Sequence, residues 1–386
     1  MASDGNGQVS PYSTTKIAHH PEVLEALRVG ADWPPLFVQW MPTNLCNQAC
    51  EFCSYGHWKP GTQGPPASAW KNNKLFDEKQ FMPQAKMQET VASLHALGCK
   101  AVEITGGGEP TTYPWFDEMV ESIGKTGMEV ALVSNGVLLT PDRVKRLADV
   151  PFTWARISID AGSPETYCAI RHVPQGHFTK ALQGLERLAK AKSHPEARVG
   201  MGYVIDRKNW HDVYMGCRIA KDHGADNVRV SVAFTPDAMN RWAPSQIDEA
   251  IDQVRRAKQD FESHDFHVSN LSRERWDNLL HTKQAYPYCY WKDVACVIGG
   301  DCKVYTCCSL AYNPMGLIGD LREQSFSKLW KSPEARTFRM RHNPRVDCPV
   351  WCLFERRNLD ALKFIADPAE AEAVRARGTP LHVNFV

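Results

Sequence analysis

Segments with a strand pattern and segments with a helix pattern alternate along most of the chain. Short runs of apolar residues predict six strands, at Phe37–Met41, Lys100–Thr105, Glu129–Ser134, Trp154–Ile159, Val199–Ile205 and Asn227–Val232. Apolar residues at helical spacing predict helices near Pro21–Val29, Glu78–Leu97, Trp115–Lys125, Pro141–Ala148, Phe178–Ala191 and Trp210–His223. In the second of these helices Asp77 is the expected cap and Gly98 the expected stop. Six strand–helix units in series predict a parallel sheet with right-handed crossovers.

Several of the predicted strands also carry polar residues at every second position. Glu103 alternates with Val102 and Ile104, and Arg229 alternates with Val228 and Val230. Parallel strands that are covered on both faces are almost continuously apolar, so one face here looks into a wet or ligand-filled space. This pattern favours an α/β fold, a partial (β/α)6 TIM-like barrel with a polar lumen, whose ligands lie at the C-terminal ends of the strands. Glu103 and Arg229 either pair with each other or contact a substrate, and the sequence does not choose.

The remaining segments divide the chain into four predicted regions. These are a polar tail and leading helix (1–35), the barrel (36–240), a linking segment with a helix at Ser245–Phe261 (241–285), and a small α+β C-terminal domain with its tail (286–386). The last region holds a hairpin pattern at Val297–Tyr305 and a short helix at Ser325–Trp330. Residues 1–16 are expected to be disordered, and the Gly/Pro-rich stretch His57–Lys74 is a candidate lid.

Charge and composition restrict the class of protein. The 386 residues include 45 Lys and Arg and 44 Asp and Glu, so no global field attracts nucleic acid or an anionic membrane. No apolar run approaches the ~18–20 residues that span a bilayer, and the N-terminus lacks the apolar region of a signal peptide. We therefore expect a cytoplasmic enzyme.

The thirteen cysteines fall into two groups. Three lie at 46–53, seven lie between 289 and 352, and Cys99, Cys168 and Cys217 fall between the groups. A reducing compartment does not favour a disulfide framework, so the two groups indicate two metal centres. Cys46, Cys50 and Cys53 give the spacing C-x3-C-x2-C. Three thiolates suit a [4Fe–4S] cluster with one open iron better than tetrahedral zinc, although a partial zinc knuckle stays as an alternative.

Five features in this order make the sequence resemble the radical S-adenosylmethionine (radical SAM) superfamily over residues 36–235. They are the cysteine loop with Phe52 before its third cysteine, the run Thr105–Pro110, the run Ser134-Asn135-Gly136, the strand end Arg156–Asp160, and the later run Gly319–Trp330. Residues 286–352 resemble the SPASM/twitch extension that a subset of these enzymes carries.

The resemblance implies a role for each matching residue. Cys46, Cys50 and Cys53 would hold the cluster that binds S-adenosylmethionine (SAM). The implied contacts to SAM come from Phe52, Gly106, Gly107, Gly108, Glu109, Ser134, Asn135, Arg156, Ser158 and Asp160. Glycines are expected because the main chain must approach the ligand without a Cβ in the way. Two alternatives stay open: an ordinary tight turn at Gly106–Pro110, and a helix-capping pair at Ser158 and Asp160.

The second cysteine group indicates one auxiliary [4Fe–4S] cluster of the twitch type. The expected ligands are Cys289, Cys307, Cys348 and Cys352, with structural zinc as the alternative. Cys296, Cys302 and Cys308 are then surplus and are candidate hydrogen donors to substrate. Cys302 is the strongest candidate, because a turn after Gly-Gly-Asp is expected to expose its side chain.

The resemblance implies an enzyme that cleaves SAM reductively to a 5′-deoxyadenosyl radical, which abstracts hydrogen from an unactivated C–H bond. Oxidation or epimerisation of a small, sugar-like or aminocyclitol-like substrate is the favoured outcome. Modification of a peptide side chain is the first alternative, and a non-catalytic iron–sulfur or zinc scaffold is the second. The expected partners are the substrate and an external electron donor such as flavodoxin or ferredoxin, with no nucleic acid and no membrane.

Overall fold

The computed structural model describes residues 12–55, 75–233, 243–270, 284, 286–348 and 352–386. The candidate lid His57–Lys74 lies outside these ranges. Within them, no helix is both long enough and apolar enough to cross a membrane.

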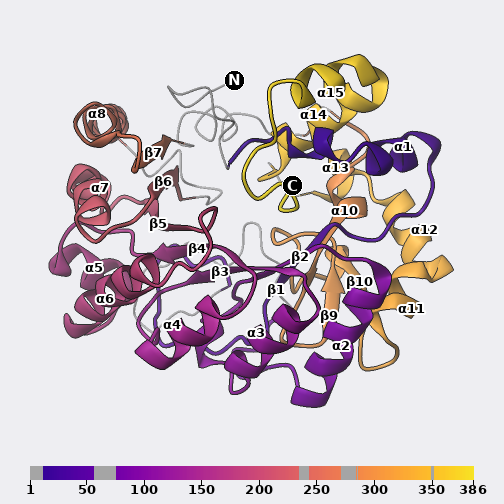
Figure 1. Ribbon diagram of the computed structural model, residues 1–386, viewed down its shortest axis with the longest axis horizontal. Helices are drawn as coiled ribbons and strands as arrows, with labels where there is room; N and C mark the ends of the chain where they lie inside the picture. The colour runs from indigo at the N-terminus through magenta and orange to yellow at the C-terminus, as the bar shows by residue number, and fades with distance from the viewer. Residues whose placement is uncertain (1–11, 56–74, 234–242, 271–283, 285, 349–351) are drawn as a thin grey trace.

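One curved sheet organises the described part of the chain (Figure 1). Its order is β10-β9-β8-β1-β2-β3-β4-β5-β6-β7, and the run from β8 to β7 is parallel throughout. The strands are β1 (Phe37–Trp40), β2 (Ala101–Ile104), β3 (Glu129–Ser134), β4 (Phe152–Ser158), β5 (Arg198–Ile205), β6 (Asn227–Val232), β7 (His267–Asn270), β8 (Ala295–Ile298), β9 (Lys303–Tyr305) and β10 (Leu317–Asp320). All six predicted strands are confirmed, and β7 extends the parallel series beyond them.

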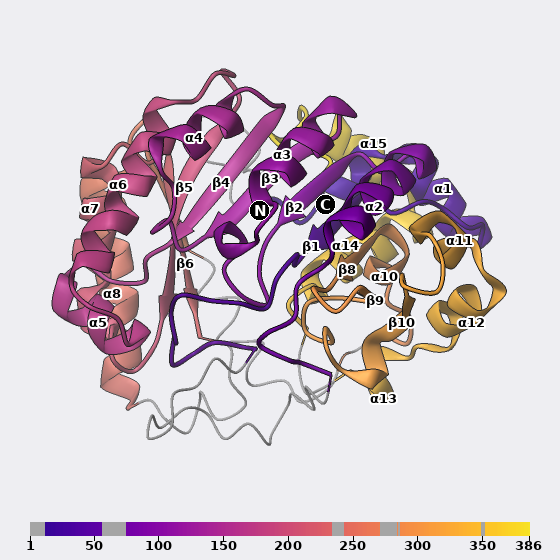
Figure 2. The same cartoon turned by 90° about the horizontal axis from the view of Figure 1, so that it is seen from below.

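Helices cover the outer face of this sheet (Figure 2). Around the barrel they are α2 (Gln84–Leu97), α3 (Phe116–Lys125), α4 (Pro141–Ala148), α5 (Pro164–Arg171), α6 (Gly176–Lys190), α7 (Val213–Asp222) and α8 (Pro244–Phe261), whereas α1 (Pro21–Val29) precedes β1 and packs in a second core with the C-terminal helices. The C-terminal region adds α10 (Trp291–Val294), α11 (Phe326–Lys331), α12 (Pro333–Arg341), α13 (Pro344–Asp347), α14 (Glu355–Ala366) and α15 (Pro368–Arg375). Helix α5, which the sequence analysis did not predict, carries Arg171 and contacts the first cysteine loop.

The predicted start of α2 was wrong. The helix begins at Gln84 rather than Glu78, and Asp77 does not cap it. The preceding residues instead run beside the loop after β1, where the Asn44 amide donates to the Gln80 carbonyl (2.8 Å) and the Met82 amide to the Pro42 carbonyl (2.9 Å). Tertiary pairing therefore overrides the local helix signal in this segment.

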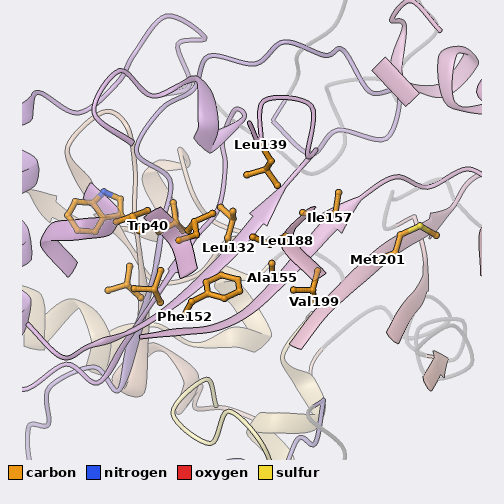
Figure 3. Packing of buried hydrophobic residues seen from close by; sticks show 14 of the residues in the cluster. Trp40, Leu132, Leu139, Phe152, Ala155, Ile157, Leu188, Val199 and Met201 are labelled. Carbon is orange, nitrogen blue, oxygen red and sulfur yellow. The ribbon is translucent and has the colours of Figure 1, made fainter. Parts of the chain in front are cut away.

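The main core lies between the sheet and the outer helices (Figure 3). Strand β4 shows how the alternating pattern produces it, because Ala155 and Ile157 are buried in this core while Arg156 is only half-buried and lines the lumen. A lumen lined by polar side chains is thus confirmed.

A second core closes the end of the lumen where the strands begin. It is built from residues near both ends of the described chain, including Ile17, Phe385 and Val386, which pack with Phe37 of β1. The buried ammonium of Lys16 donates to the carbonyls of His382 (2.9 Å) and Phe385 (3.1 Å). For residues 12–16 the expectation of disorder was therefore wrong; residues 1–11 lie outside the described part.

The C-terminal region continues the barrel sheet. Strands β8 and β9 form the predicted antiparallel hairpin, but β8 also pairs in parallel with β1, with Cys296 opposite Val38. The consequence is that residues after β9 lie beside the C-terminal ends of β1 and β2, where the first cysteine group lies.

Candidate functional site

The loop of Cys46, Cys50 and Cys53 follows β1 and is fixed to helix α5. The amides of Ala49 and Glu51 donate to the carbonyls of Arg171 (3.1 Å) and Ile170 (3.0 Å). The last carbonyls of a helix have no partner within it, so the cysteine loop satisfies two groups that would otherwise need water. All three thiols in this loop are half-buried.

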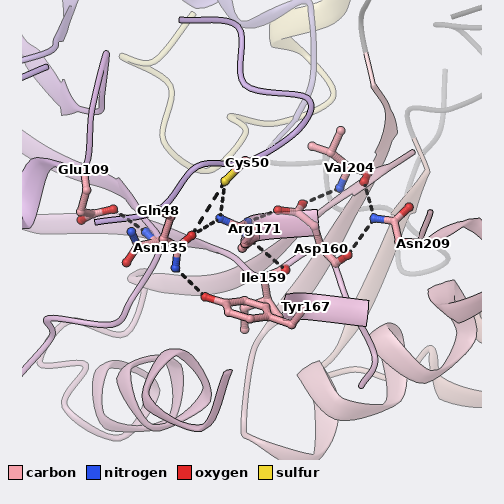
Figure 4. A network of polar contacts seen from close by, with 10 residues as sticks. All are labelled: Gln48, Cys50, Glu109, Asn135, Ile159, Asp160, Tyr167, Arg171, Val204 and Asn209. Atoms are coloured by element: carbon pink, nitrogen blue, oxygen red, sulfur yellow. Dashed lines mark hydrogen bonds and ion pairs between the residues drawn. The ribbon is translucent and has the colours of Figure 1, made fainter. Parts of the chain in front are cut away.

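Arg171 ties this loop to the end of β4 (Figure 4). Its guanidinium pairs with the carboxylate of Asp160 and donates to Gln48 Oε1 (2.6 Å) and Cys50 Sγ (3.3 Å). Burial alone would lower the pKa of Arg171, but Cys50 and Asp160 raise it, so the guanidinium stays charged. Burial raises the pKa of the Cys50 thiol to about 11, and the charge of Arg171 opposes this rise and so favours the thiolate form that a metal cluster requires.

The glycine-rich loop after β2 lies against the segment that leads into the cysteine loop. The Gly108 amide donates to the Thr43 carbonyl (3.0 Å), and the Glu109 amide donates to the Leu45 carbonyl (2.8 Å). The two loops therefore form one surface at the C-terminal ends of β1 and β2.

Hydrogen bonds of Glu109 connect the two loops of this surface to the end of β3. Its buried carboxylate accepts from the Thr111 hydroxyl (2.6 Å), the Ser134 hydroxyl (2.7 Å) and the Asn135 amide (2.7 Å). The Asn135 side chain in turn donates to Asn47 Oδ1 (2.6 Å) in the cysteine loop. Glu109 and Ser134 thus act on the site by positioning its loops.

The packing of the protein gives the glycines of this loop a reason of its own. A Cβ on Gly108 would lie 2.0 Å from the Leu45 carbonyl oxygen, and one on Gly107 would lie 2.6 Å from Asn44 Oδ1. Close packing of the protein on itself therefore requires glycine at these two positions. Gly106 lines the lumen and is also closely packed, because a Cβ there would lie 1.5 Å from the Gly108 carbonyl oxygen.

The polar residues at the end of β4 divide into three environments. Asp160 is fully engaged by the protein, because it pairs with Arg171 and accepts from the Val204 amide (2.6 Å). Ser158 is half-buried at the last position of the strand, and Arg156 faces the lumen over the Trp154 ring at 5.5 Å. The capping alternative does not hold, since Ser163 is the N-cap of α5.

The second cysteine group is assembled from three separate segments. Cys289 precedes α10, Cys307 follows β9, and Cys348 and Cys352 lie between α13 and α14. Burial raises the pKa of the Cys307 thiol, and the thiols of Cys308, Cys348, Cys352 and Cys289 raise it further, because all lie near it. The fold therefore brings together the four cysteines that were expected to act as ligands.

Polar groups that the sequence analysis missed surround this second group. The buried ammonium of Lys292 donates to the Cys289 carbonyl (2.8 Å) and lies 3.3 Å from Asp293 Oδ2. His342 Nε2 lies 3.4 Å from Cys348 Sγ, and the Phe354 amide donates to Cys352 Sγ (3.3 Å). No spacing signal in the sequence marks Lys292, His342 or Arg171.

The three surplus cysteines lie in different surroundings. Cys302 is 3% exposed in the main core, so the expectation that its turn exposes the side chain was wrong. Its backbone does adopt the left-handed turn conformation (φ 61°), which directs the thiol inward rather than outward. Cys296 is also buried in that core, near Cys99, whereas Cys308 lines the lumen.

A cavity of about 340 Å³ occupies the lumen. Its lining includes Thr105 and Gly106 beside the glycine-rich loop, and Cys308 and Phe354 beside the second cysteine group. The Tyr55 hydroxyl, which also lines it, donates to the Cys308 carbonyl (3.3 Å) and so joins the two cysteine regions.

The thiol sets fit iron–sulfur clusters in donor chemistry. Thiolates are the ligands that such clusters use, and main-chain amides already donate to Cys53 Sγ (3.4 Å, from Tyr55) and to Cys352 Sγ. Among the residues that the structure describes, no three His, Cys, Asp or Glu side chains converge as one metal ion requires. A [4Fe–4S] cluster binds each thiolate through a different iron, so it suits thiols that are spread more widely.

Comparison with known proteins agrees with this geometry. The family described as the radical SAM superfamily matches residues 40–217, and the one described as an iron–sulfur cluster-binding domain, SPASM, matches residues 289–352.

A tungsten-containing aldehyde ferredoxin oxidoreductase cofactor-modifying protein from Pyrococcus furiosus is 23% identical over 326 residues, covering 77% of this chain and 81% of its own. The mycofactocin maturase MftC of Mycobacterium tuberculosis is 30% identical over 207 residues, covering 53% of this chain and 46% of its own.

A solved structure shares the fold. Streptococcus suis SuiB bound to its precursor peptide SuiA superposes with a TM-score of 0.59 at 12% identity, covering 92% of this chain and 80% of that one. Fold, cysteine loops and both family matches lead to one conclusion. The chain is an enzyme of the radical SAM superfamily with a C-terminal SPASM domain, which uses SAM, a SAM-binding [4Fe–4S] cluster and an auxiliary iron–sulfur cluster.

Proposed function

We propose that this enzyme oxidises a compact small molecule held in the lumen between its two clusters. In this proposal Cys46, Cys50 and Cys53 hold the SAM-binding cluster, and Cys289, Cys307, Cys348 and Cys352 hold one auxiliary [4Fe–4S] cluster. The observation that carries the proposal is that one cavity is lined by residues beside both cysteine groups, Gly106 at one and Cys308 at the other.

The bound cofactors supply a 5′-deoxyadenosyl radical, and the residues of the chain decide what that radical meets. Oxidation then removes a hydrogen atom, a proton and an electron from the substrate. With both clusters bound, the radical would take the hydrogen atom and the auxiliary cluster would provide an acceptor for the electron. Glu103, the carboxylate on the cavity wall, is placed to accept the proton, and Gln39 Nε2 lies 3.3 Å from both of its oxygens.

The size of the cavity supports a small substrate. About 340 Å³ lies at the lower end of the range that small-molecule sites occupy. The relative from Pyrococcus furiosus, whose chain is matched over 81% of its length, is named for modifying a cofactor. A compact metabolite or cofactor precursor is therefore the favoured substrate.

Peptide modification is the second candidate function. It is favoured by the mycofactocin maturase, which is 30% identical over the matched 207 residues. A single side chain of a peptide would also fill a cavity of this size. We rank it second because that match spans 46% of the maturase, so it does not include the whole relative.

One experiment separates the two candidates. The anaerobically reconstituted enzyme, SAM and dithionite are incubated with a deuterated extract of the organism that encodes the chain, divided into small-molecule and peptide fractions. We expect deuterium in 5′-deoxyadenosine from the small-molecule fraction. Deuterium transfer from the peptide fraction alone would favour the second candidate. Absence of 5′-deoxyadenosine under all conditions would reject both candidates.

Epimerisation of the same small molecule is the alternative reaction, because the Cys308 thiol lies on the wall of the cavity. If the Cys308 thiol returns a hydrogen atom to the substrate, Cys308→Ala stops product formation while 5′-deoxyadenosine still forms. Cys296→Ala is the matched control, because Cys296 is buried in the main core. Equal product yields from the two variants would remove Cys308 from the mechanism and leave oxidation.

A further inference from the structure

The charge of the cavity wall differs from the charge of the chain. The whole sequence is nearly balanced, with a formal net charge of +1. Among the described side chains that line the cavity, in contrast, Glu103 is the one carboxylate, and the cations are Lys16 and five arginines, namely Arg156, Arg198, Arg229, Arg356 and Arg357. A cavity with one sign of charge and low-dielectric walls concentrates ligands of the opposite sign.

Two of these guanidiniums have no carboxylate partner in the part of the chain that the structure describes. The Arg156 guanidinium lies over Trp154 (5.5 Å to the ring centroid), and that of Arg357 lies over Trp291 (5.0 Å). Neither makes an ion pair within 4.0 Å there, whereas the buried Arg171 and Arg339 each have an aspartate. Both residues are half-buried and face the cavity, so their charges are partly removed from water with no protein carboxylate beside them, which is costly and unusual for a purely structural role.

The two guanidiniums face the same space from opposite parts of the fold. Arg156 lies in the middle of β4, and Arg357 lies in the first turn of α14. Burial lowers the pKa of Arg357 to about 10, Glu103 opposes that change, and the neighbouring charge of Arg156 adds to it. Arg357 therefore stays protonated at neutral pH and close enough to Arg156 to feel its charge.

From this arrangement we propose that the substrate carries an oxyanion, a carboxylate or a phosphate, that Arg156 and Arg357 bind together. The inference rests on the proposed function, because it describes the substrate of the same cavity. Planar guanidinium groups match the geometry of carboxylate and phosphate oxygens and bind them in pairs of hydrogen bonds.

The position of the arginines also orients the substrate. Arg156 lies two residues before the end of β4, deeper in the lumen than Gly106, which follows the end of β2. The anionic group therefore lies toward the beginning of the strands, and the opposite end of the substrate is directed toward the SAM-binding loops. Hydrogen abstraction is expected at a carbon remote from the anionic group.

The test measures binding of two anions that serve as probes, citrate for carboxylates and pyrophosphate for phosphates. Calorimetry is done at constant ionic strength on the full, cluster-loaded chain without SAM, with an uncharged sugar as the negative control. We expect at least one anion to bind, and Arg156→Gln or Arg357→Gln to weaken it about tenfold or more. Arg218→Gln, at an exposed arginine on α7 that pairs with Asp222 (3.6 Å), is the matched control and should not change the affinity.

Each result has a definite consequence. Selective binding of citrate assigns a carboxylate substrate, and selective binding of pyrophosphate assigns a phosphate. If a glutamine variant does not fold, Arg156→Lys and Arg357→Lys are used in its place, because they keep the positive charge. The lysine variants should lose less affinity for the anion than the glutamine variants. Wild-type protein that binds neither anion, or binding that no substitution at either arginine weakens, overturns the inference.

Failure of this inference is distinguishable from failure of the proposed function. Anion binding is measured without SAM or reductant, whereas the proposed function is tested by 5′-deoxyadenosine released from wild-type enzyme. An enzyme that cleaves SAM but binds no anion rejects only the anionic substrate.

Discussion

The two cysteine groups differ in how the chain builds them. Cys46, Cys50 and Cys53 lie within eight consecutive residues, and the loop is fixed by main-chain bonds to α5 and by the buried pair of Arg171 and Asp160. The group of Cys289, Cys307, Cys348 and Cys352 comes from three segments that span 64 residues. The first loop is therefore fixed by main-chain and charge-pair contacts of the protein, whereas the second group draws on residues far apart in the sequence, where burial and the neighbouring thiols raise the pKa of Cys307.

The largest predicted effect separates the roles of the two groups. Cys50→Ala should abolish 5′-deoxyadenosine formation, because the SAM-binding cluster loses one of three ligands. Cys352→Ala should instead keep 5′-deoxyadenosine formation and lose product. In each variant we expect iron to fall from about eight per chain to about four, since each [4Fe–4S] cluster holds four. Assays of iron, sulfide and 5′-deoxyadenosine check this, and loss of 5′-deoxyadenosine in both variants would contradict the separation.

The second prediction tests whether Arg171 fixes the first site. Arg171→Met leaves the Asp160 carboxylate buried without its cation, which should cost about 3–5 kcal/mol of the free energy of unfolding. Loss of the donor to Cys50 Sγ should also lower SAM cleavage about 10–100-fold. Denaturant unfolding and 5′-deoxyadenosine release measure the two effects.

Two variants complete this test. Arg256→Met, at an exposed arginine of α8 that pairs with Asp252 (3.0 Å), should cost less than about 1 kcal/mol. Adding Asp160→Asn to Arg171→Met should restore part of the lost stability, because the uncompensated charge is gone. If Arg171→Met alone lowers the free energy of unfolding no more than Arg256→Met does, the buried pair of Arg171 and Asp160 does not hold the loop.

Removing the metal should affect the two groups unequally. After anaerobic iron chelation, the Phe354 amide, which donates to Cys352 Sγ, should exchange with solvent at least about tenfold faster. The Ala49 amide should keep its protection, because its acceptor is the Arg171 carbonyl and not a thiol. Hydrogen exchange followed by mass spectrometry compares peptides that contain these amides, and equal loss of protection would remove the contrast between the groups.

The smallest predicted effect concerns the contact between the two regions. The Tyr312 hydroxyl donates to Asn44 Oδ1 beside the first cysteine loop and accepts from the Gly300 amide (3.3 Å). Tyr312→Phe should therefore cost about 1 kcal/mol in the free energy of unfolding without changing iron content. Tyr290→Phe is the control, since the structure gives the Tyr290 hydroxyl no hydrogen bond among the described residues. A stability loss shared by both variants would assign the effect to the ring environment instead.

Local patterns predicted the barrel and the first cysteine loop well. The six strands were predicted from short apolar runs, several of which alternate with polar residues, and the loop because its three cysteines lie within eight residues. The start of α2 and the turn at Cys302 were predicted wrongly. In both places the backbone conformation is set by distant partners, such as Pro42 for Met82 and the main core for the Cys302 thiol.

The strands and helices that were predicted, the three-cysteine loop and the glycine-rich run all depend on residues that are neighbours along the chain. For that reason the amino-acid sequence alone was enough to predict them. The tertiary structure decided which side chains share a space. It placed Arg171 against Cys50 across 121 residues, Arg357 of α14 beside Arg156 of β4, and Lys16 against the end of the chain. Burial and charge pairing act through space, and no periodicity along the chain encodes contacts between segments that folding brings together.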